Sequence, residues 1–115
     1  MTSKAERFLV AAVLATVPLA GIAQNFPERP IRLILGVATG GGQDTIARAM
    51  APRLSKALGA YVIVDNRPGA GGGIGAELAK QATPDGYTLL MISSSNVIHH
   101  ILYEASYDVR RDFSP

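Results

Sequence analysis

The sequence predicts an α/β fold: a parallel three-stranded sheet in the order strand, helix, strand, helix, strand, with a further short helix at the end. Residues 31–37 form an almost unbroken apolar run, which is typical of a strand covered on both faces. Residues 44–58 repeat apolar side chains at helical spacing, and a second strand, glycine turn and helix follow at residues 61–82. This alternation favours right-handed crossovers between parallel strands.

The first strand runs into three glycines, Gly40–Gly42, and then into a helix that starts at Gln43 or Asp44. Glycines let the backbone approach a ligand closely, and a helix start points unpaired N–H groups at the same space. We therefore expect an anion-binding corner, with Gly41 at a positive φ. A tight turn without a ligand is the alternative. Asp44 is expected to cap the helix or complement its dipole, the alternative being contact with a ligand ammonium or hydroxyl group.

The helix over residues 44–58 is expected to end at Gly59 and to carry a proline in its interior. Pro52 removes one hydrogen bond and costs ~3 kcal/mol, so we expect a kink near residues 48–52 or two shorter helices. The expected inward face consists of Ile46, Ala47, Met50, Leu54 and Leu58.

The second half of the chain repeats the pattern. A strand is expected at residues 61–64, a turn at 65–69, a helix with Ile74 and Leu78 facing inward at 74–82, a strand at 87–92 and a helix at 97–103. Ser93-Ser-Ser-Asn96 supplies good helix N-caps. If the first strand is central, the Gly40 and Ser93 loops are neighbours at the carboxyl edge of the sheet, where open α/β sheets bind ligands.

Other chemistries find little support in the sequence. The chain has no Cys, its net charge of +2 comes from interspersed residues, and its first loop lacks the Gly-Lys-Ser/Thr of a nucleotide loop. A hydrolase would need Ser94 or Ser95 with His99 or His100, but no G-x-S-x-G elbow surrounds these serines. Adjacent histidines point in different directions on a helix. We expect no metal, no cofactor and no nucleic-acid partner.

Residues 1–23 have the pattern of a secretory signal peptide. Lys4 and Arg7 precede an apolar run at residues 8–20, and small residues lead to a cut after Ala23. The run is too short for a transmembrane helix and is interrupted by Pro18. We expect an exported, periplasmic protein without a membrane anchor.

Several motifs after this segment together resemble the Bug family, the periplasmic substrate-binding proteins of tripartite tricarboxylate transporters. They are Gly40-Gly-Gly-Gln-Asp44, Asp65-Asn-Arg-Pro-Gly-Ala-Gly-Gly-Gly-Ile-Gly75, Pro84-Asp-Gly-Tyr-Thr-Leu89 and Tyr107-Asp-x-x-Arg-Asp-Phe113. The resemblance implies a type II periplasmic-binding-protein fold whose two domains close on a small organic carboxylate. It also implies transporter membrane subunits as partners, and no enzymatic activity.

The resemblance further implies that backbone N–H groups and small polar side chains of two loops hold the ligand carboxylate. The matching residues are Ala38, Thr39, Gly40, Gly41, Gly42 and Asp44 on the first loop, and Ser93, Ser94, Ser95 and Asn96 on the other. Family members are much longer than this chain. We therefore expect residues 24–115 to be the truncated N-terminal part of domain 1, with the second domain absent.

Two other functions stay open at this point. One is a small secreted α/β hydrolase-like enzyme that uses the loop of residues 93–96. The other is a non-functional truncation product that binds nothing.

Overall fold

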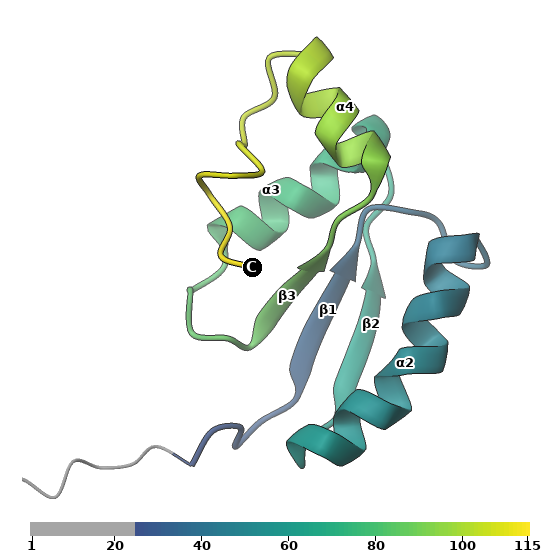
Figure 1. The fold of residues 1–115 in the computed structure, drawn as a ribbon, viewed down its shortest axis with the longest axis vertical. Coiled ribbons are helices and arrows are strands. Elements are labelled where there is room, and N and C mark those ends of the chain that lie inside the picture. Colours follow the sequence, from purple (N-terminus) through teal and green to yellow (C-terminus); the bar gives the residue numbers. More distant parts are fainter. Residues whose placement is uncertain (1–24) are drawn as a thin grey trace, which may run out of the picture.

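The computed structural model describes residues 25–115, and the expected signal peptide lies outside this part. Its sheet consists of β1 (Ile31–Leu35), β2 (Val62–Asn66) and β3 (Thr88–Met91), in the order β2-β1-β3 (Figure 1). Both strand pairs are parallel, with Leu33 opposite Val64 on one side and Leu89 on the other. The predicted α/β fold with a parallel three-stranded sheet and a central first strand is confirmed.

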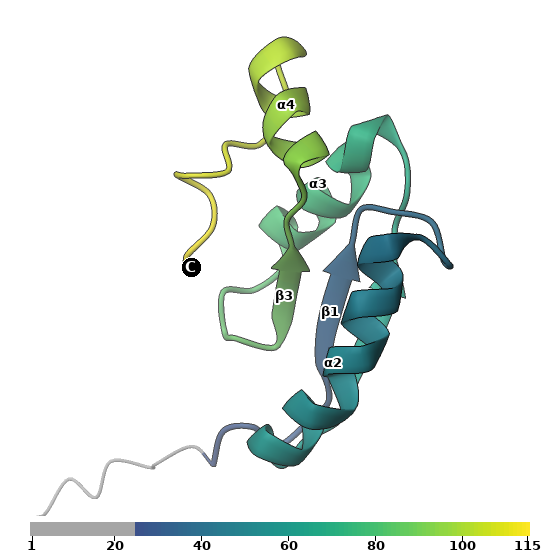
Figure 2. The same cartoon turned by 45° about the vertical axis from the view of Figure 1, so that its right-hand side comes forward.

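Helices cover the sheet from both sides. α2 (Gly42–Leu58) lies on one face, and α3 (Gly73–Gln81), preceded by the short helix η1 (Ala70–Gly72), lies on the other (Figure 2). α4 (Ser94–Leu102) continues beyond the carboxyl end of β3. Because β1 is central and covered on both faces, all its residues except Arg32 are apolar and buried, which explains its almost unbroken hydrophobic sequence.

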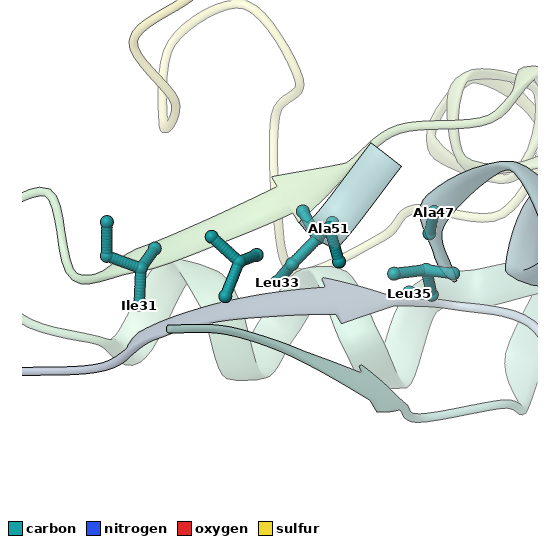
Figure 3. Packing of buried hydrophobic residues seen from close by; sticks show 6 residues of the cluster. Ile31, Leu33, Leu35, Ala47 and Ala51 are labelled. Atoms are coloured by element: carbon teal, nitrogen blue, oxygen red, sulfur yellow. The ribbon is translucent and has the colours of Figure 1, made fainter. Parts of the chain in front are cut away.

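The core lies between β1 and α2. Ile31, Leu33 and Leu35 line up along one face of the strand and meet Ala47 and Ala51 of the helix (Figure 3). These strand side chains are at most 7% exposed, and burying each contributes about 1.5–3 kcal/mol. Since the helix contributes only methyl groups at Ala47 and Ala51, its axis can lie close to the strand.

The expected inward face of α2 is partly wrong. Ile46, Met50 and Leu58 are 53%, 44% and 38% exposed, respectively. Ala47 is buried as predicted. The other buried positions are Asp44 and Ala51, which were not predicted and which lie three and four residues from Ala47. The helix is therefore rotated so that its small residues and its first-turn carboxylate face the sheet.

A single helix spans Gly42–Leu58, so the expected alternative of two shorter helices is wrong. Pro52 is exposed, and its ring occupies the solvent side of α2, where a helix tolerates a missing hydrogen bond best. The second half of the helix is also tied to β2. The Val62 N–H donates to the Ser55 hydroxyl oxygen at 2.8 Å, and that hydroxyl donates to the Ala51 carbonyl at 2.8 Å.

The carboxyl end of β2 and the start of α4 lie two and three residues from their predicted positions. β2 extends to Asn66, past the expected turn at Asp65, since the Asp65 carboxylate pairs with Arg32 on β1 and with Arg67. α4 begins at Ser94, three residues earlier than expected, with Ser93 as its N-cap. The expected inward position of Ile74 in α3 is wrong, because this side chain is 49% exposed.

The segment after α4 returns to α3. Tyr107 is 2% exposed, and its hydroxyl donates to the Asn96 carbonyl at 3.0 Å. Lys80 of α3 forms an ion pair with Asp112 at 3.1 Å. Within residues 25–115, no helix is long and apolar enough to cross a membrane.

A glycine pair tests the close packing of the loops. A Cβ at Gly36 would lie 2.6 Å from the Gly72 Cα, so Gly36→Ala must separate two backbone segments and should lower the free energy of unfolding by about 1–3 kcal/mol. Gly42 lies in α2 with nothing within 4 Å of its added Cβ. Gly42→Ala should therefore stabilise the chain by up to about 1 kcal/mol. Urea unfolding followed by circular dichroism measures both, and a neutral Gly36→Ala would contradict the packing.

Candidate functional site

Two strand-to-helix connections meet at the carboxyl edge of the sheet. Loop 1 (residues 36–41) joins β1 to α2, and loop 3 (residues 92–93) joins β3 to α4. Because β1 and β3 are paired neighbours, their following loops emerge side by side. The Gln43 side chain links the two, since its Nε2 donates to the Met91 carbonyl at 2.9 Å. Sequence reasoning did not assign this role to Gln43.

Loop 1 leads into a helix start that has no capping side chain. Gly41 is the N-cap, and the N–H groups of Gly42, Gln43 and Asp44 have no hydrogen-bond partner among residues 25–115. The five sequence-predicted residues before Gln43 are all exposed: Ala38, Thr39, Gly40, Gly41 and Gly42. The positive end of the α2 dipole therefore meets an accessible backbone segment.

The expected positive φ at Gly41 is wrong. Gly41 has φ −74° and ψ 168°, an extended conformation open to any residue, whereas Gly40 has φ +89°. The turn needs a left-handed residue one position earlier than expected. An added Cβ at Gly41 would contact only the Ala38 carbonyl oxygen, at 3.5 Å.

Asp44 turns its carboxylate back onto its own loop. The Gly40 N–H donates to Oδ2 at 2.8 Å, and Arg48 Nε lies 3.0 Å from both carboxylate oxygens. The bond from Arg48 and then that from Gly40 lower the pKa of Asp44 to about 2, against the opposing effect of burial. With its side chain only 4% exposed, the carboxylate bonds loop 1 and Arg48 and makes no capping hydrogen bond to the first N–H groups of α2.

Arg48 extends this network to β2. Its Nη2 donates to Asn66 Oδ1 at 2.9 Å, and Asn66 Nδ2 donates to the Val37 carbonyl at 3.1 Å. Sequence reasoning assigned neither Arg48 nor Asn66 to the site. The spacing of Asp44 and Arg48, four residues apart on a helix, could have indicated the ion pair, but the Asn66 contact depends on strand register.

Loop 3 and the first turn of α4 hold four sequence-predicted residues in three different environments. Asn96 is 1% exposed, and its Oδ1 accepts the Ser93 N–H at 3.0 Å and the Ser93 hydroxyl at 2.9 Å. The Ser95 hydroxyl lies 2.7 Å from that of Ser93. Ser94 is exposed, and its hydroxyl has no partner within the described residues.

Asn96 also joins loop 3 to the glycine turn before α3. Its Nδ2 donates to the Gly72 carbonyl at 2.9 Å, and Gly72 has φ +90°. The buried amide thus bonds on both sides, as buried polar groups must. The Asn96 side chain therefore holds Ser93 in place.

The serines and histidines form no catalytic pair. Across residues 25–115, no side-chain hydrogen bond joins a hydroxyl of Ser93, Ser94 or Ser95 to a histidine. His99 stacks between Tyr103 and Tyr107, at ring-centroid distances of 5.3 and 6.3 Å. Within the described residues, no group of three or more His, Asp or Glu side chains could hold a metal ion.

Two shallow grooves, of about 390 and 460 Å³, lie on either side of His99, away from loop 1. The first runs between α3 and the segment around Ser106, and the second runs between Gly71 and Tyr103. Of the ten sequence-predicted site residues, only Ser95 lines one of them. The carboxyl edge with the free N–H groups is accordingly an open surface on this chain.

Comparison with known proteins places the chain in a family. Residues 46–115 match the model of the tripartite tricarboxylate transporter family receptor, TctC. A UPF0065 protein of Bordetella bronchiseptica is 43% identical over 114 residues, which are 96% of this chain and 34% of that protein. The chain thus spans about a third of the length of this curated relative, and the alignment includes loop 1.

Solved structures agree with the fold. The periplasmic binding protein BugD is 43% identical and superimposes with a TM-score of 0.55, over 56% of this chain and 22% of BugD. MatC from Rhodopseudomonas palustris, solved with bound malate, is 38% identical, with the same TM-score and the same coverage. With a family model that covers more than half of its residues, the chain belongs to the Bug family of tripartite tricarboxylate transporter receptors.

Proposed function

We propose that this chain supplies the carboxylate-binding edge of the first domain of a periplasmic solute-binding protein. The observation that carries the proposal is the uncapped start of α2, where three backbone N–H groups without partners follow an exposed glycine loop. A helix start of this kind binds anions through its N–H groups and its dipole. A small dicarboxylate such as malate, which MatC binds, fits this chemistry.

The electrostatics of the edge suit an anion although Asp44 lies in the first turn. Arg48 pairs with that carboxylate, so the pair carries no net charge, and the Gly40 N–H is already bonded to it. The N–H groups of Gly42 and Gln43 are left for a ligand. The exposed Ser94 hydroxyl at the start of α4 supplies a further donor.

The rest of the function rests on the family. We take residues 24–115 as the N-terminal part of domain 1 of a two-domain protein, in which a second domain closes over the ligand and membrane subunits receive it. Within residues 25–115 no hydroxyl of Ser93, Ser94 or Ser95 bonds a histidine, which gives a hydrolytic enzyme no support. The chain is therefore a binding module and no enzyme.

Malate titration of the 115-residue chain tests the proposal. One open edge leaves much of the anion hydrated, so we expect binding no tighter than about millimolar, equivalent to ~4 kcal/mol. In ¹⁵N NMR spectra the saturable shifts should centre on the amides of Gly41, Gly42 and Gln43, and succinamide, which has no carboxylate, should not reproduce them. The absence of saturable shifts at these amides would overturn the proposed function.

Gly41→Ala probes the same edge by steric obstruction. The position tolerates a Cβ, so the melting temperature should stay close to that of the parent chain. A methyl group beside the N–H donors should weaken malate binding by at least about tenfold, or ~1.4 kcal/mol. If Gly41 serves the turn alone, malate binding will be unchanged, and loop 1 must be removed from the site.

Export is the third testable part of the proposal. A cleavable signal peptide predicts a periplasmic product that begins at Gln24. Intact-mass measurement of the periplasmic fraction should show the loss of residues 1–23. A product that keeps these residues and sediments with the membrane would argue against it.

A further inference from the structure

Loop 1 is held at both of its ends by side chains from other elements. At one end, Asn66 of β2 donates to the Val37 carbonyl at 3.1 Å. At the other, Asp44 accepts the Gly40 N–H at 2.8 Å. Only Ala38 and Thr39 lie between these two anchors, and both are exposed.

Arg48 joins the two anchors into one network. Its Nε lies 3.0 Å from both Asp44 carboxylate oxygens, and its Nη2 donates to Asn66 Oδ1 at 2.9 Å. The side chains of Asp44, Arg48 and Asn66, which we call the clamp, therefore connect the last residue of β2 to both ends of loop 1. Of the three, only Asp44 is among the residues that the resemblance assigns to the ligand site.

The residue types of the clamp match its geometry. A guanidinium presents several donors in a fixed plane, so Arg48 can serve a carboxylate and an amide oxygen together, whereas a lysine ammonium is a single point charge on a flexible stem. An asparagine amide both accepts and donates, so Asn66 can bond Arg48 and the Val37 carbonyl simultaneously. An aspartate there could accept from Arg48 but could not donate to a carbonyl.

Arg48 contributes to loop 1 mainly by the hydrogen bonds that it makes, and less by its charge. Its side chain is 50% exposed, and ion pairs that are open to solvent contribute little by themselves. A loop that is already ordered binds more tightly, because the ordering cost is met before the ligand arrives.

We propose that Arg48 and Asn66 are positioning residues that preorganise loop 1 for its ligand. The effect on binding rests on the proposed function, whereas the clamp itself can be tested without any ligand. The Arg48→Lys and Asn66→Asp variants each remove one link and keep a polar side chain. Arg53→Gln is the matched control, because Arg53 is exposed on the same helix and has no ion pair or side-chain hydrogen bond within residues 25–115.

The ligand-free test follows Gly40 and Asp44 by NMR. Hydrogen exchange of the Gly40 amide should become at least about tenfold faster in both clamp variants and stay unchanged in Arg53→Gln. The Asp44 carboxyl, whose pKa is about 2 in the parent chain, should titrate at a higher pH in Arg48→Lys. Unchanged exchange and titration in the clamp variants would overturn the proposal whatever the chain binds.

The lowered pKa of Asp44 makes the stability of the folded chain depend on pH. Because the pKa of Asp44 is depressed on folding, its stabilising contribution is complete above the ordinary pKa of about 3.9 and is lost as the pH falls toward 2. In Arg48→Lys the folded-state pKa of Asp44 should rise toward its ordinary value, so this loss of stability should be smaller and should be complete at a higher pH. Arg53→Gln should follow the parent profile.

The binding test uses malate as the probe. Each clamp variant should weaken malate binding by about threefold or more, although the backbone N–H donors themselves are unchanged. The double variant should bind malate about as weakly as the single variants, because each change breaks the same network. Faster exchange at Gly40 with unaltered malate affinity would overturn the positioning role and leave the proposed function intact. If the parent chain binds no malate, the proposed function fails, and the exchange and titration measurements still decide whether the clamp holds loop 1.

Discussion

The close approach of Gly36 to Gly72 sets the arrangement of the whole carboxyl edge. A Cβ at Gly36 would lie 2.6 Å from the Gly72 Cα, and one at Gly75 would lie 3.1 Å from the Gly36 Cα. Such distances exist only because these residues are glycines, so the first connection can lie directly against the start of α3. Asn96 packs on the other side of Gly72, where an added Cβ would lie 2.5 Å from its Nδ2. Three connections from three strands are thereby stacked within van der Waals contact.

This stacking explains why two polar side chains are buried at the edge. Asp44 and Asn96 are 3% and 1% exposed, and each bonds backbone groups that the turns leave without partners. Asp44 stabilises the glycine turn of loop 1, while Asn96 fixes Ser93 and Gly72. Both therefore act on the backbone of the loops, and the exposed backbone between them is free to meet a ligand.

The sequence predicted the elements better than their contacts. The unbroken apolar run of β1 was sufficient to indicate a strand covered on both faces, and the glycine turns fixed where helices begin. The inward face of α2 was predicted correctly at Ala47 but wrongly at Ile46 and Met50, because these larger side chains carry a stronger hydrophobic signal than Ala51. The small size of Ala47 and Ala51 lets the helix lie on β1. The role of Asn66 could not be derived, because its partners depend on strand register and on the rotation of α2.

The pairing of Asp44 with Arg48 resolves an apparent conflict at the proposed anion-binding edge. A free carboxylate in the first turn would repel a ligand carboxylate, at a cost that grows as water is excluded. The ion pair cancels that charge within 3.0 Å, and the Gly40 N–H donates to Asp44 rather than to the ligand. What remains toward solvent is a set of backbone N–H dipoles with fixed directions. Recognition by such dipoles depends on the orientation of a carboxylate more than on its total charge. Under the proposed function, the geometry of loop 1, which Asn66 and Arg48 contact, therefore matters more than the net charge of +2.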